Sequence, residues 1–159
     1  YATNAQMAYP VKSSRKSIPH HNIAIGLIHN DRDELLIAKR PKDAMLGGLW
    51  EFPGGKQEEN ESLHETCARE LQEELNINVQ VGPLFETLDH AYSHFKITLH
   101  AYPCRITGGT PQPTNGMPFR WASVNELSDY AFPRANRRII ERLEHRNEQP
   151  DLFSGDADK

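Results

Sequence analysis

Short apolar runs alternate with polar turns along most of the chain, and their spacing predicts strands interrupted by helices. Residues 23–28 are apolar over the length of a strand, and residues 30–33 follow as turn formers. Residues 95–101 alternate apolar with polar side chains, which is typical of a half-buried strand. The other predicted strands are residues 35–37, 79–81, 84–88 and 119–122, and the predicted helices are residues 63–75, 124–129 and 136–143. This order of elements predicts an α/β sandwich.

The helix predicted at residues 63–75 carries glutamates that do not fit a simple amphipathic pattern. Ser62 and Glu65 form a capping box, and leucines and Cys67 repeat along one face as a core stripe. Glu74 falls inside that stripe, about 20° from Leu63 in helical projection. An unpaired carboxylate is costly to bury, so Glu74 needs a cation or several hydrogen-bond donors. The alternative is a solvated acidic helix face.

Glu70 and Glu73 lie beside Glu74 at helical spacing, so the oxygens of all three carboxylates converge. Three anions this close repel one another unless a cation sits between them. Oxygen ligands suit a hard divalent ion, so we expect Mg²⁺ or Mn²⁺ at this helix.

Composition and charge limit the classes of protein that fit. The chain has 159 residues, enough for one domain, and a formal net charge of -4 excludes a global basic field for nucleic acid. We therefore expect any contact with DNA to be local. No apolar run reaches the roughly 18 residues of a membrane span. Two cysteines exclude a disulfide framework or a four-cysteine cluster and favour a reducing, cytoplasmic location.

The two ends of the chain differ from its middle. Residues 1–21 lack acidic residues and contain Lys12, Arg15 and Lys16 with two prolines, so we expect an extended basic lead-in that contacts phosphates. The alternative is a solvated tail. Residues 146–159 are rich in Asp and Gly, and we expect an acidic, disordered tail. The folded domain is thus predicted at residues 22–145.

Gly55, Glu61 and residues 69–77 resemble the Nudix box, G-x5-E-x7-R-E-U-x-E-E-x-G-U, where U is a bulky aliphatic residue. Every defined position matches except the last glycine, which is Asn76 here, and Asn tolerates the left-handed conformation that ends a helix. The resemblance implies the Nudix fold, a mixed β-sheet between helices in an α/β/α sandwich. It also implies a hydrolase in which Glu70, Glu73 and Arg69 are catalytic. By the same resemblance, the metal ligands are Gly54, Glu70, Glu73 and Glu74.

Two groups within this family handle 8-oxoguanine, and residues 23–144 resemble both. One group is the MutT-type hydrolases, which convert 8-oxo-dGTP to 8-oxo-dGMP and pyrophosphate. By this resemblance Asn136 would bond the purine base and Phe52 would line its pocket. The alternatives are a helix N-cap for Asn136 and an ordinary core position for Phe52.

The other group is the C-terminal recognition domain of MutY-type adenine DNA glycosylases, which reads 8-oxoguanine opposite adenine. Three features favour it: the lead-in is similar to the interdomain linker, Asn115 stands where MutT-type enzymes carry an acidic residue, and Tyr92, Ser93 and His94 are similar to the base-reading loop. The resemblance implies that these three residues contact the base. Backbone phosphates would meet Lys12, Arg15, Lys16, Arg40 and Lys56, with Lys96 as a further contact.

We therefore expect a monomeric recognition domain in base-excision repair, bound to DNA that contains 8-oxoguanine opposite adenine. The glycosylase reaction and its iron–sulfur cluster would then belong to a domain outside this chain, because the cluster needs four cysteines. The alternative is a free-standing Mg²⁺-dependent hydrolase of 8-oxo-dGTP. A nearly complete Nudix box argues for that alternative, since a binding module needs no metal cluster.

Overall fold

The sheet is built around two long strands, β1 (His20–His29) and β7 (Lys96–Gly108), in a computed structural model that describes residues 18–148. These strands run parallel, with His20 opposite Lys96 and His29 opposite Arg105. The other strands pair around them as β2 (Leu35–Lys39), β3 (Trp50–Glu51), β4 (Gly54–Lys56), β5 (Asn78–Val81), β6 (Glu86–Ala91) and β8 (Phe119–Ala122). β4 pairs with β1 in antiparallel register, which brings Gly54 opposite Ile25 and Gly55 opposite Ala24.

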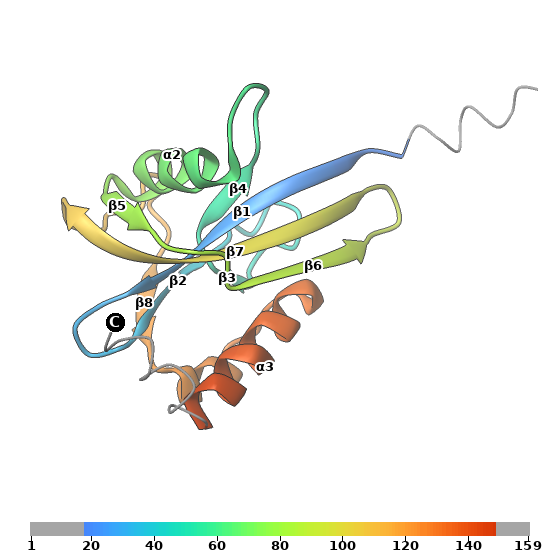
Figure 1. The fold of residues 1–159 in the computed structure, drawn as a ribbon. Helices are drawn as coiled ribbons and strands as arrows, with labels where there is room; N and C mark the ends of the chain where they lie inside the picture. Colours follow the sequence, from blue (N-terminus) through green and yellow to red (C-terminus); the bar gives the residue numbers. More distant parts are fainter. Residues whose placement is uncertain (1–17, 149–159) are drawn as a thin grey trace, which may run out of the picture.

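One helix covers each face of this sheet (Figure 1). Helix α2 (Leu63–Leu75) packs its buried Cys67, Leu71 and Leu75 against Ala24 and Ile28 of β1. On the opposite face, α3 (Arg134–Glu148) and the 3₁₀ helix η2 (Val124–Asp129) pack against a second cluster that includes Ile25 and Leu27. Alternate residues of β1 therefore enter different cores, as strand geometry requires. The predicted α/β sandwich is confirmed.

Local signals in the sequence fix both ends of α2. The Ser62 Oγ accepts a hydrogen bond from the Glu65 backbone N–H at 3.1 Å, and the Ser62 N–H donates to Glu65 at 2.8 Å, which is the predicted capping box. The helix ends at Asn76, whose φ of 58° is left-handed. Asn therefore serves here in the position that the Nudix pattern gives to glycine.

A distant loop completes the C-terminal end of α2. The Thr114 hydroxyl donates to the carbonyl of Glu73 at 3.0 Å, and the Thr114 N–H donates to the carbonyl of Glu74 at 2.9 Å. The Gln112 N–H donates to the carbonyl of Leu75 at 2.9 Å. The last carbonyls of a helix have no hydrogen-bond donor within that helix. The loop supplies these donors to the last turn of α2, which carries two of the predicted metal ligands.

The element boundaries differ from the sequence prediction in several places. β1 begins at His20, inside the predicted lead-in. β6 covers residues 86–91, where the sequence predicts a strand at residues 84–88, because its backbone pairs with β7 and this pairing does not require apolar side chains. α3 continues past residue 145 to Glu148, and the Arg146 guanidinium lies over the ring of Phe85 at 5.7 Å, which anchors that last turn.

Some of the predictions fall outside the described residues, namely those for Lys12, Arg15, Lys16 and the tail beyond residue 148. Within residues 18–148 no helix is long and apolar enough to cross a membrane.

Candidate active site

Arg69 is the centre of the ion-pair network on α2. Its Nε donates to Glu61 at 2.6 Å, and one Nη donates to Glu70 at 2.9 Å and to Glu73 at 3.2 Å. The other Nη donates to the carbonyl of Lys56 at 3.0 Å and so ties the helix to β4. The hydrogen bond from Arg69 is the main reason that the pKa of Glu61 falls to about 2. The pairing of Arg69 with the helix carboxylates, expected from the Nudix box, is present in the structure.

The two glycines of β4 let the helix carboxylates approach the strand. A Cβ added at Gly55 would lie 2.6 Å from Oε2 of Glu70 and nearer still to the other two carboxyl atoms. The Gly54 N–H donates to the Glu74 carboxylate at 3.3 Å. Burial and the nearby carboxylates of Glu51 and Glu70 raise the pKa of Glu74 to about 8. Glu74 is therefore the acid within the core stripe that the helical pattern predicts; it is half-buried, and the long hydrogen bond from Gly54 offsets the cost of its charge only weakly.

These groups fit Mg²⁺ by their chemistry. They are carboxylate and backbone oxygens, which Mg²⁺ prefers, and a cation at this site would stabilise the charged form of Glu74, which its surroundings disfavour. Among residues 18–148, no three His, Cys, Asp or Glu side chains are already grouped closely enough to hold a metal. When bound to Glu70, Glu73, Glu74 and the Gly54 carbonyl, the ion would neutralise phosphate charge and activate water.

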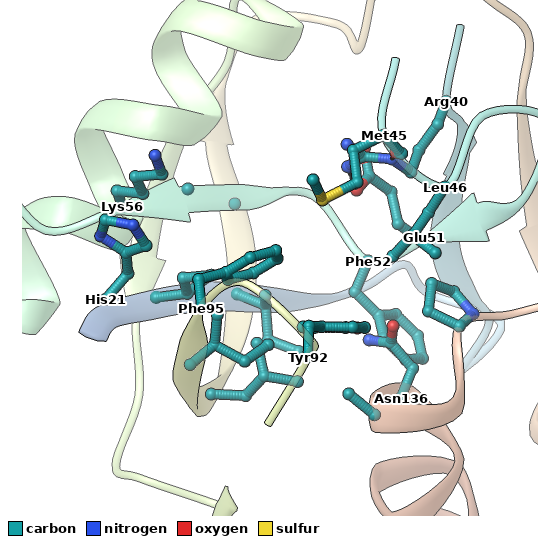
Figure 2. Close-up of a pocket in the computed structure, with 18 of the residues that line it drawn as sticks. His21, Arg40, Met45, Leu46, Glu51, Phe52, Lys56, Tyr92, Phe95 and Asn136 are labelled. Atoms are coloured by element: carbon teal, nitrogen blue, oxygen red, sulfur yellow. Dashed lines mark hydrogen bonds and ion pairs between the residues drawn. The ribbon is translucent and has the colours of Figure 1, made fainter. Parts of the chain in front are cut away.

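A cleft of about 590 Å³ lies on the opposite face of β4 and runs along the sheet. Figure 2 shows Lys56, His21 and Phe95 at one end, Tyr92 in the middle, and Phe52 and Asn136 at the other end. Gly54 and Gly55 form part of the cleft wall, and Gly55 also contacts Glu70 of α2. The short strand β4 therefore lies between the cleft and α2. A ligand in this cleft would therefore have an aromatic region at one side, and only the backbone of Gly54 and Gly55 would lie between it and the carboxylates of α2, none of which lines the cleft.

Asn136 and Phe52, predicted from the resemblance to contact the base, meet at one end of the cleft. Phe52 is 2% exposed and stacks on Phe132 with ring centroids 5.3 Å apart, so it is both a core residue and part of the cleft wall. Asn136 is the third residue of α3 and not its N-cap. It is 7% exposed, and its side-chain amide makes no hydrogen bond within the described part of the chain. A buried amide without a partner is costly, so Asn136 is suited to a ligand.

The base-reading loop predicted from the MutY resemblance is only partly at the cleft. Tyr92 and His94 line it, and Tyr92 stacks on Phe95 with ring centroids 4.7 Å apart. Ser93 is exposed in the turn between β6 and β7 and does not line the cleft. The serine contact with a base therefore stays a prediction.

Arg40 and Lys56, both predicted to contact phosphates, line the cleft at different places. The Arg40 guanidinium donates to Glu51 at 2.7 Å and to the carbonyl of Met45 at 2.8 Å, so it already holds the neighbouring loop. Burial raises the pKa of Glu51, and Arg40 partly offsets that shift. Sequence analysis did not single out Glu51, Phe95, His21 or Thr114. Of these four residues, only Glu51 is marked by its sequence neighbourhood, because it precedes the Phe-Pro-Gly-Gly segment that leads into the Nudix box.

Comparison with known proteins gives the family. A profile of the NUDIX domain matches residues 24–142, which is most of the chain. The chain belongs to the Nudix family. The 8-oxo-dGTP diphosphatase of Escherichia coli is 38% identical over 121 residues, which cover 76% of this chain and 94% of that protein. The CTP pyrophosphohydrolase of the same organism is 36% identical over 112 residues, or 70% of this chain and 83% of that protein.

Solved structures agree with this Nudix assignment. The MutT protein from Methanosarcina mazei superimposes with a TM-score of 0.74 at 25% identity, covering 82% of this chain and 97% of that one. The ORF135 protein of E. coli gives a TM-score of 0.70 at 30% identity, covering 83% of this chain and 94% of that one. The predicted hydrolase class is confirmed, because the similar curated proteins include a diphosphatase and a pyrophosphohydrolase.

The MutY resemblance also has a counterpart among these relatives. The human adenine DNA glycosylase is 29% identical over 143 residues, which span 83% of this chain but only 25% of the human protein. The diphosphatases of E. coli and Buchnera aphidicola subsp. Schizaphis graminum match over 94% and 92% of their own length. With its higher sequence identity, the diphosphatase of E. coli supports a MutT-type hydrolase better than the human enzyme supports a glycosylase domain, which reverses the order expected from the sequence.

Proposed function

We propose that this chain is a Mg²⁺-dependent Nudix hydrolase that converts 8-oxo-dGTP and water to 8-oxo-dGMP and pyrophosphate. The observation that carries the proposal is the buried, unpartnered amide of Asn136 in a cleft whose wall, at Gly54 and Gly55, also contacts the acidic helix. An amide both donates and accepts, so one side chain is able to pair with a guanine edge.

The cleft orders the parts of such a substrate. In this proposal the base would lie between Phe52 and Tyr92 with its edge at Asn136, and the triphosphate would run along Gly54 and Gly55 toward Lys56, all of which line the cleft. The phosphates would then pass the backbone of Gly55, against which the Glu70 carboxylate lies. Arg69 holds the carboxylates of Glu70 and Glu73 in position, so a water molecule is oriented for attack at phosphorus while the pyrophosphate leaves toward Lys56.

Substitution of one glutamate of α2 tests the proposed hydrolysis. Glu73→Gln keeps the shape of the side chain but removes its charge, and we expect Mg²⁺-dependent release of pyrophosphate from 8-oxo-dGTP to fall at least 100-fold. Glu59→Gln is the matched control, because Glu59 is exposed and precedes α2. Equal turnover in both variants would show that the carboxylates of α2 do not carry the reaction.

A second candidate is the recognition domain of an adenine DNA glycosylase. The match to the human enzyme supports it, since it spans 83% of this chain. In that case the chain would prefer a duplex with 8-oxoguanine opposite adenine over one with guanine opposite adenine. Ser93→Ala would reduce the preference by roughly 0.5–1.5 kcal/mol, the value of one hydrogen bond. Equal binding of the two duplexes by the parent protein argues against this candidate.

A further inference from the structure

Two neighbouring apolar side chains lie exposed at the mouth of the cleft. Met45 is 59% exposed and Leu46 is 38% exposed, yet both line the cleft, whereas Phe52 and Asn136 form its buried floor. Figure 2 shows Met45 and Leu46 together, above Tyr92 and Asn136 in that view. We call Met45 and Leu46 the apolar rim. Exposed apolar side chains are common singly, but a pair of them at the mouth of a cleft suits a ligand.

The backbone that carries the apolar rim is held in an unfavourable conformation. Leu46 has a φ of 58°, in the left-handed region that leucine rarely adopts. The loop is fastened on both sides of this residue, because the Arg40 Nε donates to the carbonyl of Met45 at 2.8 Å and the Gly48 N–H donates to the carbonyl of Arg40 at 3.1 Å. Strain of this kind gathers at ligand sites. Here it keeps a leucine at the cleft and partly in water, so folding alone does not account for it.

The floor below the apolar rim already offers partners to a flat ring. The side-chain amide of Asn136 is buried and makes no hydrogen bond within the described part of the chain, and Tyr92 stacks on Phe95 in the same cleft. A ring placed between floor and rim would pair its edge with the amide and cover the apolar atoms of the rim with its face. Burial of that surface favours binding. A sugar or a phosphate fits less well, because Met and Leu side chains have no hydrogen-bond donor for its oxygens.

We propose that Met45 and Leu46 bind the nucleobase by covering one face of the purine from the solvent side of the cleft. This inference rests on the proposed function for the identity of the nucleotide and adds the residues that enclose its base. The contact is apolar, so it contributes affinity for the ring while the amide of Asn136 pairs with the polar edge. The flexible thioether of Met45 adapts its shape to the ring. Neither residue touches the reacting phosphates, so both act on KM and leave kcat unchanged.

The test is isothermal titration calorimetry with 8-oxo-dGMP, the proposed product, whose binding requires no hydrolysis. Met45→Ala combined with Leu46→Asn removes the apolar rim, and Asn adopts the left-handed conformation readily, as Asn76 does at the end of α2. Full burial of one such side chain favours binding about tenfold or more, and both are already partly covered, so we expect Kd to rise about tenfold for the pair. The heat-capacity change of binding should become less negative, because less apolar surface is buried.

Two further variants accompany this test. Met45→Ala alone leaves the backbone of Leu46 untouched and should raise Kd about threefold. Leu84→Asn is the matched control, because Leu84 is 51% exposed but does not line the cleft, and its Kd should equal that of the parent.

Three results would overturn the inference. The first is an unchanged Kd in both rim variants, and the second is an equal rise in Kd in the Leu84→Asn control. The third is a lower unfolding temperature in the double variant, which would give the rim a structural role. We expect that temperature to equal or exceed the parent value, because Asn relieves the strain at Leu46.

Steady-state hydrolysis of 8-oxo-dGTP by the same preparations separates this inference from the proposed function. A raised KM with unchanged kcat in the double variant supports both. Weaker binding of 8-oxo-dGMP by the variant, with no hydrolysis by the parent, would remove the proposed activity and leave the rim as a base site. Hydrolysis with equal KM in parent and variant would remove the rim and leave the activity. A parent protein that neither binds 8-oxo-dGMP nor hydrolyses 8-oxo-dGTP would remove both.

Discussion

Gly55→Ala is predicted to separate catalysis from folding. The added methyl group would lie 2.6 Å from Oε2 of Glu70 and closer to the other two carboxyl atoms, where ordinary contact begins at 3.4 Å. The carboxyl group must therefore move by about 1 Å, a misplacement that typically costs on the order of 100-fold in rate. We expect kcat/KM for 8-oxo-dGTP to fall by that factor, which corresponds to about 2.7 kcal/mol of transition-state stabilisation.

The fold should tolerate the same change. The obstructing atoms are at the far end of a flexible side chain, so Glu70 moves away without displacing the backbone. The free energy of unfolding should change by less than about 1 kcal/mol, the lower end of the cost of overpacking. Pyrophosphate release gives kcat/KM, and thermal unfolding followed by circular dichroism on the same sample gives the change in stability.

Gly54→Ala is the matched comparison on the neighbouring residue. There the added Cβ would lie 2.7 Å from the Ile25 Cα and nearer still to the Ala24 carbonyl oxygen, and both belong to the backbone of the central strand β1. We expect destabilisation of roughly 3 kcal/mol. An active Gly55→Ala enzyme would refute the placement of Glu70, and a fully stable Gly54→Ala protein would refute the close contact of β4 with β1.

Three other variants test separate parts of the site. Asn136→Ala should lower kcat/KM for 8-oxo-dGTP about tenfold, since one hydrogen bond to the base is worth roughly 1–1.5 kcal/mol; unchanged steady-state kinetics would remove Asn136 from base recognition. Glu61 has a pKa of about 2 against an ordinary 4.5, so its contribution to stability is complete above about pH 4.5 and is lost as pH falls toward 2. Glu61→Gln should flatten unfolding temperature against pH in that window, and an unaltered profile would contradict the Arg69 pairing. Thr114→Ala should destabilise the protein by about 1 kcal/mol in urea unfolding while Thr114→Ser retains the parent value, because serine keeps the hydroxyl that bonds the end of α2.

Helix α2 and its glutamates were predictable because their information is local. The capping box, the leucine spacing and Asn76 are all within fifteen residues, and the structure reproduces the helix bounds that they predict. The partial burial of Glu74 followed from the helical projection alone. The same local pattern does not distinguish a hydrolase from a recognition domain, because both retain this framework.

Features that depend on distant pairing were not predictable. β6 is a strand because it pairs with β7, and residues 89–90 in it are Asp and His. Thr114 contacts α2 across about forty residues of sequence, and no local pattern marks it. Ser93 illustrates the reverse case, where a resemblance in sequence gave a role to a side chain that does not line the cleft.

The two clusters of buried residues on opposite faces of β1 have a consequence for how such enzymes diversify. Residues proposed to select the base pack with α3 on one face, while those that anchor α2 pack on the other, and β4 lies between the two sets. Changes at the α3 end of the cleft therefore lie away from the carboxylates of α2. A lineage could exchange one nucleobase for another by altering a handful of positions, while the machinery that cleaves the phosphate chain is inherited intact.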